Sequence, residues 1–410
     1  MKTAEKEQLI QKVENGSVTT PKGFFAGGIH AGLRYSKKDV GILFSTKPAS
    51  VAAVYTQNHF QAAPLKVTQE SISKSQKLQA IVVNSAIANA CTGEKGLQDA
   101  YEMRKLTAER LNIDENLVAV ASTGVIGEFL QMDKIKKGIQ ELQYSSFDEG
   151  AKEFQEAILT TDTIIKGSCY EVIVEGKKVT IGGAAKGSGM IHPNMATMLG
   201  FITTDANVPT PLLQQALKEI TDVTFNQITV DGDTSTNDMV IVMANGEAEH
   251  SPLTENHPEW HTFKEGLKLV CEDLAKQIAR DGEGATKLVE VTVKGANSKQ
   301  DANIIAKKIV GSSLVKTAIY GLDVNWGRIV AAIGYSDAKV NPDETEIYIG
   351  PYLTFKNGLP QPFNEEDATE YLKNEHVEIT VLLSEGNEEG KAWGCDLTYD
   401  YVKINASYRT

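Results

Sequence analysis

The most informative segment of this chain is Lys186-Gly-Ser-Gly-Met-Ile-His-Pro-Asn-Met-Ala-Thr-Met-Leu-Gly200. It places Thr197 directly after a small residue, Ala196, in an apolar run that is spaced by glycines. A threonine hydroxyl is a weak nucleophile unless a base lies beside it, and a free α-amine on the same residue can be that base. A free amine at Thr197 requires cleavage of the Ala196–Thr197 bond. The segment therefore predicts a maturation cut and a nucleophilic threonine, and so indicates both a processing event and a class of reaction.

The composition of the whole chain narrows the class of protein. Its 410 residues, 41% hydrophobic and 23% charged, are typical of a globular protein with two domains or two large lobes. The formal charge of −13 argues against a nucleic-acid groove or an anionic membrane surface as the main partner. The N-terminal residues include no apolar signal region, and the four cysteines form no CxxC pair. We therefore expect a cytoplasmic protein with reduced thiols that binds neither nucleic acid nor membranes.

Apolar periodicity predicts strands and helices on both sides of the opening segment. Two β-branched runs, Gln79–Asn84 and Leu117–Ala121, predict buried strands, and a hairpin is expected to turn at Glu175-Gly176. Helices are expected over Gln98–Leu111, from an Asp133 cap, from Thr210-Pro211, over Phe263–Ile278 and over Asn303–Ile309, with a strand around Val289–Val293 and a loop at Asp323–Arg328. The order lacks a strict βαβ rhythm, which favours an α+β layered sandwich over a doubly wound sheet.

Two polar segments look like ligand loops but lack the residues that those loops need. In Gly182–Gly189, Lys186 precedes its glycine, whereas a phosphate loop needs Gly-Lys-Ser/Thr, so nucleotide binding is rejected. This run is either a flexible turn or backbone placed close to a small substrate. In Asp231–Asp238, the positions for a calcium-loop glycine and glutamate hold Thr236 and Val242. Side-chain-to-backbone hydrogen bonds in a tight turn are the preferred interpretation, and no metal site is expected.

Three further positions each have a structural and a functional interpretation. The small residues of Ser122–Gly127 follow a predicted strand, where they form either an ordinary turn or an oxyanion hole. Glu283, between two glycines, is either a solvated carboxylate or a partner for a cationic ligand. His192 precedes Thr197 by five residues, but a His-Pro turn is more often structural than a catalytic base.

In order along the chain, these segments resemble the ornithine acetyltransferase family, the bifunctional glutamate N-acetyltransferases of arginine synthesis. The resemblance covers essentially the whole chain, and the His-Pro-Asn-Met-Ala-Thr-Met-Leu segment is very specific. It is carried by the segments Gly28–Gly32, Asn89–Gly93, Ser122–Gly127, Thr160–Thr163, Lys186–Leu199, Thr229–Asp238, Asp281–Lys287, Asn325–Arg328 and Asp396–Asn405. The run Asn84–Asn89 and the residue Val324 depart from the family pattern.

The resemblance implies a layered α/β sandwich related to self-cleaving aminopeptidases. It implies a cut before Thr197, which gives an α chain of residues 1–196 and a β chain of residues 197–410 in an α2β2 assembly. In the implied ping-pong reaction, the Thr197 hydroxyl takes the acetyl group of N-acetylornithine, and glutamate then leaves as N-acetylglutamate. The implied oxyanion hole consists of Thr123 and Gly124. The implied substrate contacts are Thr163, Lys186, Thr197, Glu283, Asn405 and Thr410.

No cofactor is expected, and the sequence leaves open whether acetyl-CoA is a second acetyl donor. The main alternative is an amidohydrolase or aminopeptidase that uses the same N-terminal threonine. The other alternative is a catalytically silent binding protein of this fold.

Overall fold

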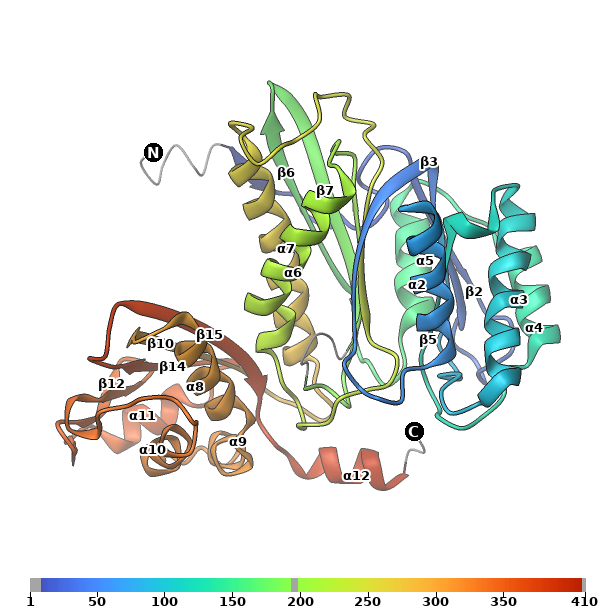
Figure 1. The fold of residues 1–410 in the computed structure, drawn as a ribbon. Coiled ribbons are helices and arrows are strands. Elements are labelled where there is room, and N and C mark those ends of the chain that lie inside the picture. Colours follow the sequence, from blue (N-terminus) through green and yellow to red (C-terminus); the bar gives the residue numbers. More distant parts are fainter. Residues whose placement is uncertain (1–8, 193–197, 408–410) are drawn as a thin grey trace.

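The computed structural model describes residues 9–192 and 198–407, which form two bodies, each built on its own sheet (Figure 1). The first body contains a nine-stranded sheet, and the second contains a six-stranded sheet. Helix α7 (Trp260–Arg280) ends where the second body begins, and strand β10 (Leu288–Ala296) follows it. No helix among the described residues is long and apolar enough to cross a membrane.

The nine-stranded sheet is organised around one long strand, β3 (Val40–Tyr55). Its first half pairs with β2 and β4 and its second half with β9, with a shift of register between Phe44 and Ala49. The strand order is β1-β6-β7-β8-β9-β3-β4-β5, and the pairs β4–β5 and β8–β9 are parallel. The remaining strands are β1 (Ile10–Lys12), β2 (Phe24–Ile29), β4 (Lys77–Asn84), β5 (Val118–Ser122), β6 (Lys166–Val174), β7 (Lys177–Lys186), β8 (Leu199–Thr204) and β9 (Met239–Ala244).

Helices cover both faces of this sheet, because its buried strands are apolar on both sides. In β9, Val240 and Val242 pack in one core with α6 (Thr210–Val223) and α7, whereas Met239 and Ile241 belong to the core on the other face. That second core includes Phe154 of α5 (Asp148–Ile158), whose ring lies 5.4 Å from the ring of Phe201. The other helices are α2 (Ala63–Ser75), α3 (Gly93–Leu111) and α4 (Met132–Glu141). This layering confirms the predicted α+β sandwich.

The second body packs helices against the six-stranded sheet, whose order is β13-β12-β11-β14-β10-β15. Its strands after β10 are β11 (Glu346–Ile349), β12 (Tyr352–Lys356), β13 (Leu359–Pro360), β14 (His376–Leu382) and β15 (Glu388–Cys395), and its helices are α8 (Lys299–Gly311), α9 (Ser313–Tyr320), α10 (Trp326–Gly334) and α11 (Glu365–Tyr371). The last helix, α12 (Tyr399–Ser407), leaves this body and runs beneath the first one (Figure 1). It thereby brings the end of the chain back to the larger body.

Most predicted elements lie where the periodicity placed them, and two local predictions were wrong. Helix α4 begins at Met132 with Gln131 as its N-cap, so Asp133 lies inside the first turn, where a carboxylate favours the helix dipole. The segment Asp323–Arg328 is a loop only at its start, because Asn325 caps helix α10 by accepting a hydrogen bond from the Arg328 amide. Of the two interpretations left open for the glycine run, a flexible turn does not describe residues 182–186, since β7 continues through Lys186.

The glycines in β7 allow close packing rather than a turn. A Cβ atom at Gly182 would lie 2.0 Å from the backbone oxygen of Ser17, and one at Gly183 would lie 2.8 Å from Leu274 of α7. Any side chain at Gly182 would therefore push the N-terminal segment off the strand. The consequence for the site is that Lys186 lies at the rigid end of a strand.

Candidate active site

A hollow of about 200 Å³ opens where the end of β7 meets the starts of β8 and β9. It contains five of the predicted site residues, namely Thr123, Gly124, Lys186, Glu283 and Asn405. These come from the loop after β5, the end of β7, the loop after α7, and α12. The other lining residues used below are Thr160, Met190, Ile191, Met198, Leu199, Asp231, Asp233, Asp238 and Tyr401.

Gly124 provides a backbone donor at the wall of the hollow. Its φ of +123° lies in a region that L side chains rarely adopt, and a Cβ there would lie 2.2 Å from the Ala86 oxygen. The flanking amides of Thr123 and Val125 donate to the backbone oxygens of Asn84 and Ala86. The Gly124 N–H, in contrast, has no acceptor within the part of the chain that the structure describes. An unpaired donor held by a strained loop is what an oxyanion hole requires.

Lys186 is a buried cation that faces hydroxyl groups. Its Nζ donates to Thr160 Oγ1 at 2.8 Å and to Thr123 Oγ1 at 3.3 Å. Burial lowers the pKa of Lys186, and the nearby charge of Lys166 acts in the same direction, although carboxylates including Asp162 oppose the shift. An anionic ligand in the hollow would give the Lys186 ammonium group a partner of opposite charge. The two hydroxyls are a weaker substitute for such a partner.

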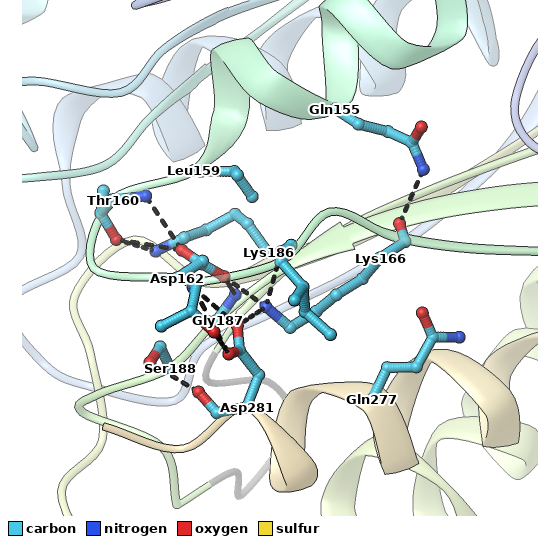
Figure 2. Close-up of polar contacts among 12 residues, drawn as sticks. Gln155, Leu159, Thr160, Asp162, Lys166, Lys186, Gly187, Ser188, Gln277 and Asp281 are labelled. Carbon is cyan, nitrogen blue, oxygen red and sulfur yellow. Dashed lines mark hydrogen bonds and ion pairs between the residues drawn. The ribbon is translucent and has the colours of Figure 1, made fainter. Parts of the chain in front are cut away.

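A buried ionic network fixes the loop that carries Thr160 (Figure 2). Asp162 accepts hydrogen bonds from the Gly187 amide at 2.7 Å and the Thr160 amide at 2.9 Å. Lys166 places its Nζ 2.7 Å from Asp162 Oδ1 and 2.5 Å from Asp281 Oδ2, and its side chain is fully buried. Although burial acts to raise the pKa of Asp162, the charges of Lys166 and Lys186 hold that pKa well below its usual range. The network joins the residue after Lys186 to the end of α7.

The structure separates two threonines of the Thr160–Thr163 segment. Thr163 does not line the hollow; its amide and hydroxyl both donate to Asp281 on the opposite side of the ionic network. Thr160 is the one that contacts Lys186 and lines the hollow. The sequence motif contained Thr160, but its spacing alone gave no sign of which hydroxyl would face the ligand.

Glu283 and Asn405 form the wall that the second body contributes. Asn405 Nδ2 donates to Glu283 Oε2 at 2.7 Å, so α12 is tied to the loop after α7. The Glu283 side chain is buried, and a Cβ at Gly189 would lie 2.4 Å from its carboxylate. The Glu283 carboxylate thus lies against the backbone of Gly189, which explains why a residue without a side chain occupies that position.

The Asp231–Asp238 segment is the predicted tight polar turn. Asp231 accepts hydrogen bonds from the amides of Met190 at 2.7 Å and Ile191 at 2.9 Å. The Thr234 hydroxyl donates to the His192 oxygen at 2.8 Å. The turn therefore holds the irregular segment of residues 187–192 that follows β7.

His192 is poorly suited to be a base. Its Nδ1 lies 2.9 Å from Thr229 Oγ1. Burial and the charges of Lys307 and Lys308 lower the pKa of His192 to about 4. A ring with so low a pKa accepts protons weakly at neutral pH, which favours the structural interpretation of this residue.

Three predicted site residues, Ala196, Thr197 and Thr410, lie outside the described residues. On the two sides of the gap at 193–197, Ile191 and Met198 both line the hollow. In residues 9–192 and 198–407 no group of three or more His, Cys, Asp or Glu side chains could hold a metal ion.

Comparisons with known proteins agree along nearly the whole chain. A family model described as the ArgJ family matches residues 25–410. The arginine biosynthesis bifunctional protein ArgJ of Bacillus licheniformis is 67% identical over 399 residues, which cover 97% of this chain and 98% of the relative. The protein of the same name from Geobacillus kaustophilus is 64% identical over 409 residues, which cover 100% of both chains.

Two solved structures were also matched. The crystal structure of ArgJ from Bacillus halodurans is 62% identical with a TM-score of 0.45, and covers 46% of this chain and 98% of that one. Ornithine acetyltransferase from Mycobacterium tuberculosis, complexed with ornithine, is 34% identical with a TM-score of 0.43, and covers 46% of this chain and 100% of that one. On the strength of the family model and the curated relatives, the chain belongs to the ArgJ family.

Proposed function

We propose that this chain cleaves itself between Ala196 and Thr197 and then transfers acetyl from N-acetylornithine to glutamate through an ester on Thr197. As a member of the ArgJ family, the chain is an acyltransferase of arginine biosynthesis. The observation that carries the chemistry is the hollow itself. It combines the free Gly124 N–H, the buried Lys186 cation and the Glu283 carboxylate around the two ends of the segment that contains Thr197.

In the first half-reaction the Thr197 hydroxyl attacks the acetyl carbonyl and its proton passes to the Thr197 α-amine. The tetrahedral intermediate carries a negative charge on its oxygen. Thr123 and the Gly124 N–H stabilise that charge. The C–N bond breaks, ornithine leaves, and acetyl remains as an ester on Thr197. In the second half-reaction the glutamate amine attacks that ester and leaves as N-acetylglutamate.

Both substrates carry groups that match the charges of the hollow. Each has an α-carboxylate, and Lys186 is a buried cation whose hydrogen-bond partners, within residues 9–192 and 198–407, are hydroxyls. The ornithine side chain carries an ammonium group, which suits the Glu283 carboxylate. Asn405, hydrogen-bonded to Glu283, closes this side, and Thr410 is proposed to extend the same wall.

The proposal extends to the assembly and to the second donor. The α chain of residues 1–196 and the β chain of residues 197–410 form an α2β2 enzyme that needs no cofactor, and acetyl-CoA is a candidate second donor. A cytoplasmic location fits Cys169, Cys271 and Cys395, which are buried and free.

Two variants of Thr197 test the proposal. Thr197→Ala should remain one uncut chain on denaturing electrophoresis and should make no N-acetylglutamate, because one hydroxyl serves both reactions. Thr197→Ser keeps a hydroxyl and should retain both reactions at reduced rates. Cleavage that persists in T197A would contradict the assignment. Acetate produced without N-acetylglutamate by the unaltered enzyme would support the hydrolase instead.

A further inference from the structure

Asp238 is a buried carboxylate on the wall of the hollow that the chemistry above does not use. It comes directly before β9, and Met198 comes directly before β8. These two strands are parallel with Leu199 opposite Met239, and the Met239 amide donates to the Met198 oxygen at 3.0 Å. Asp238 therefore lies beside Met198, the described residue that follows Thr197 in the sequence.

One oxygen of this carboxylate lacks a hydrogen-bond donor among the described residues. Asp238 is 4% exposed, and its Oδ2 is buried without a hydrogen-bond partner among the described residues. A buried polar atom without a partner costs free energy, so its retention at the wall of a cavity indicates that a ligand supplies the missing donor.

The side chains around the hollow offset the negative charge of the Asp238 carboxylate only in part. Four ionisable side chains other than Asp238 and Tyr401 line it, of which Lys186 is the cation and Asp231, Asp233 and Glu283 are carboxylates. Burial raises the pKa of Asp238 well above its usual value, and Ser235 and Lys186 offset this only in part. Burial therefore favours the protonated form of this carboxyl group, compared with an exposed aspartate.

Acetyl transfer between amines requires proton transfer at the nitrogen atom that gives up or receives the acetyl group. An α-amine in water at neutral pH is mostly protonated, and an ammonium nitrogen has no lone pair with which to attack an ester. The leaving amine has the opposite need, because an amide C–N bond breaks readily only when its nitrogen receives a proton. Both needs arise at the same nitrogen position, since donor and acceptor carry acetyl on the α-amino group.

Building on the proposed function, we propose that Asp238 exchanges protons with the substrate α-amino group. In the first half-reaction the protonated carboxyl gives its proton to the departing ornithine nitrogen as the C–N bond breaks, and Asp238 becomes a carboxylate. In the second, that carboxylate takes a proton from the glutamate ammonium. The neutral amine then attacks the acetyl ester, the ester C–O bond breaks, and the Thr197 oxygen takes back the proton that its α-amine holds. The second proton of the attacking nitrogen passes to water, the released ornithine amine takes one proton from water, and Asp238 is again protonated. Over one cycle the proton count balances.

The test compares substrates that require proton exchange with Asp238 against substrates that do not. p-Nitrophenyl acetate replaces N-acetylornithine as a donor whose leaving group departs without a proton. Hydroxylamine replaces glutamate as an acceptor that is already unprotonated at neutral pH. The rates of Asp238→Asn and of the unaltered enzyme are measured for all four donor and acceptor combinations.

We expect D238N to lose about 100-fold or more with N-acetylornithine and glutamate, in the range typical of proton-transfer catalysis, and to change little with p-nitrophenyl acetate and hydroxylamine. The matched control is Asp205→Asn. Asp205 is also buried with a pKa raised by burial, but it accepts the Thr180 amide at 2.8 Å and does not line the hollow. D205N should change all four combinations by the same factor.

A uniform loss in D238N over all four combinations, or no loss at all, would overturn the inference. If D238N does not accumulate as folded protein, the pH profile of the unaltered enzyme decides. The rate with N-acetylornithine should fall as pH rises through the pKa of Asp238, and the ester donor should show no such fall. An unaltered enzyme that made acetate and no N-acetylglutamate would refute the proposed function, yet the contrast between amide and ester donors would still report on Asp238.

Discussion

Replacing Lys166 with methionine would remove the cation that Asp162 and Asp281 share. The side chain of Lys166 is 0% exposed, and its Nζ lies 2.7 Å and 2.5 Å from the two carboxylates. Methionine has a similar length and keeps most of the packing, but it leaves two buried carboxylates without their cation. Breaking a buried ion pair in this way typically costs about 3 to 5 kcal/mol of unfolding free energy.

An exposed ion pair of similar length gives the matched control. Lys12 Nζ lies 2.8 Å from Asp273 Oδ2, but the two side chains are 50% and 21% exposed. Solvent screens such a pair, so Lys12→Met should cost no more than about 1 kcal/mol. Distance is nearly the same in the two pairs, and burial is what differs.

The free energy of unfolding should depend on pH in a direction set by the pKa of Asp162. The pKa of Asp162 is depressed in the folded protein, so its contribution to stability is present above the unfolded value of about 4 and is lost as pH falls through the folded value. In K166M the depression by Lys166 is gone, and burial acts to raise the carboxylate pKa. Among the described residues, only Lys186 then remains as a cation opposing this shift for Asp162, so acidification should protonate Asp162 more readily than in the unaltered enzyme and relieve part of the unpaired charge. The stability gap between K166M and the unaltered enzyme should therefore narrow on acidification.

Urea denaturation followed by tryptophan fluorescence at pH 7.5 and pH 5 measures these differences. The reasoning would be refuted if K166M and K12M lost the same stability, or if the K166M gap were equal at both pH values. Either outcome would mean that water reaches the network despite its burial.

Two further predictions concern the hollow. Gly124→Ala should lower the rate of enzyme acetylation by about 100- to 1,000-fold, measured in single turnovers, because a Cβ 2.2 Å from the Ala86 oxygen must displace the loop and its donor N–H; an unchanged rate would remove Gly124 from the oxyanion hole. Thr160→Val should raise the KM for N-acetylornithine by roughly five- to tenfold, since it removes one hydrogen bond of Lys186. Thr163→Val should raise that KM less, and the reverse order would favour the Thr163 contact expected from the family resemblance.

The elements could be predicted where local periodicity decides them. The hairpin at Glu175-Gly176 and the helix start at Thr210 follow from residues within one turn of each other, and both are present. The sequence left two interpretations of the glycine run open because glycine occurs both in turns and where backbones pack closely. Only the tertiary structure shows Ser17 and Leu274 against β7. Local sequence also could not decide between Gln131 and Asp133 as a cap, since the path of the preceding chain fixes that choice.

The polar network of the site lay beyond what the sequence could reveal. Lys166 and Asp281 are 115 positions apart, and nothing in either local pattern indicates that they meet. Asp238 was visible only as the last acidic residue of a turn. The role proposed for Asp238 rests on burial and an unpartnered oxygen, which are properties of the folded chain. The sequence motifs thus pointed to segments that meet at the hollow, whereas the direction of each side chain within a segment depends on packing.

The sheet also explains how a cut before Thr197 is compatible with an intact site. The cut would leave Thr123, Gly124 and Lys186 on one product, and Asp238 and Glu283 on the other. Yet β7 and β8 pair from Lys186 opposite Leu199 to Ile181 opposite Thr204, and β3 pairs with β9 over a further six positions. Phe154 and Phe201 pack across the same boundary in a buried core. Because these contacts do not depend on the bond between residues 196 and 197, cleavage can free an amine at Thr197 while backbone pairing and apolar packing keep the two halves of the hollow together.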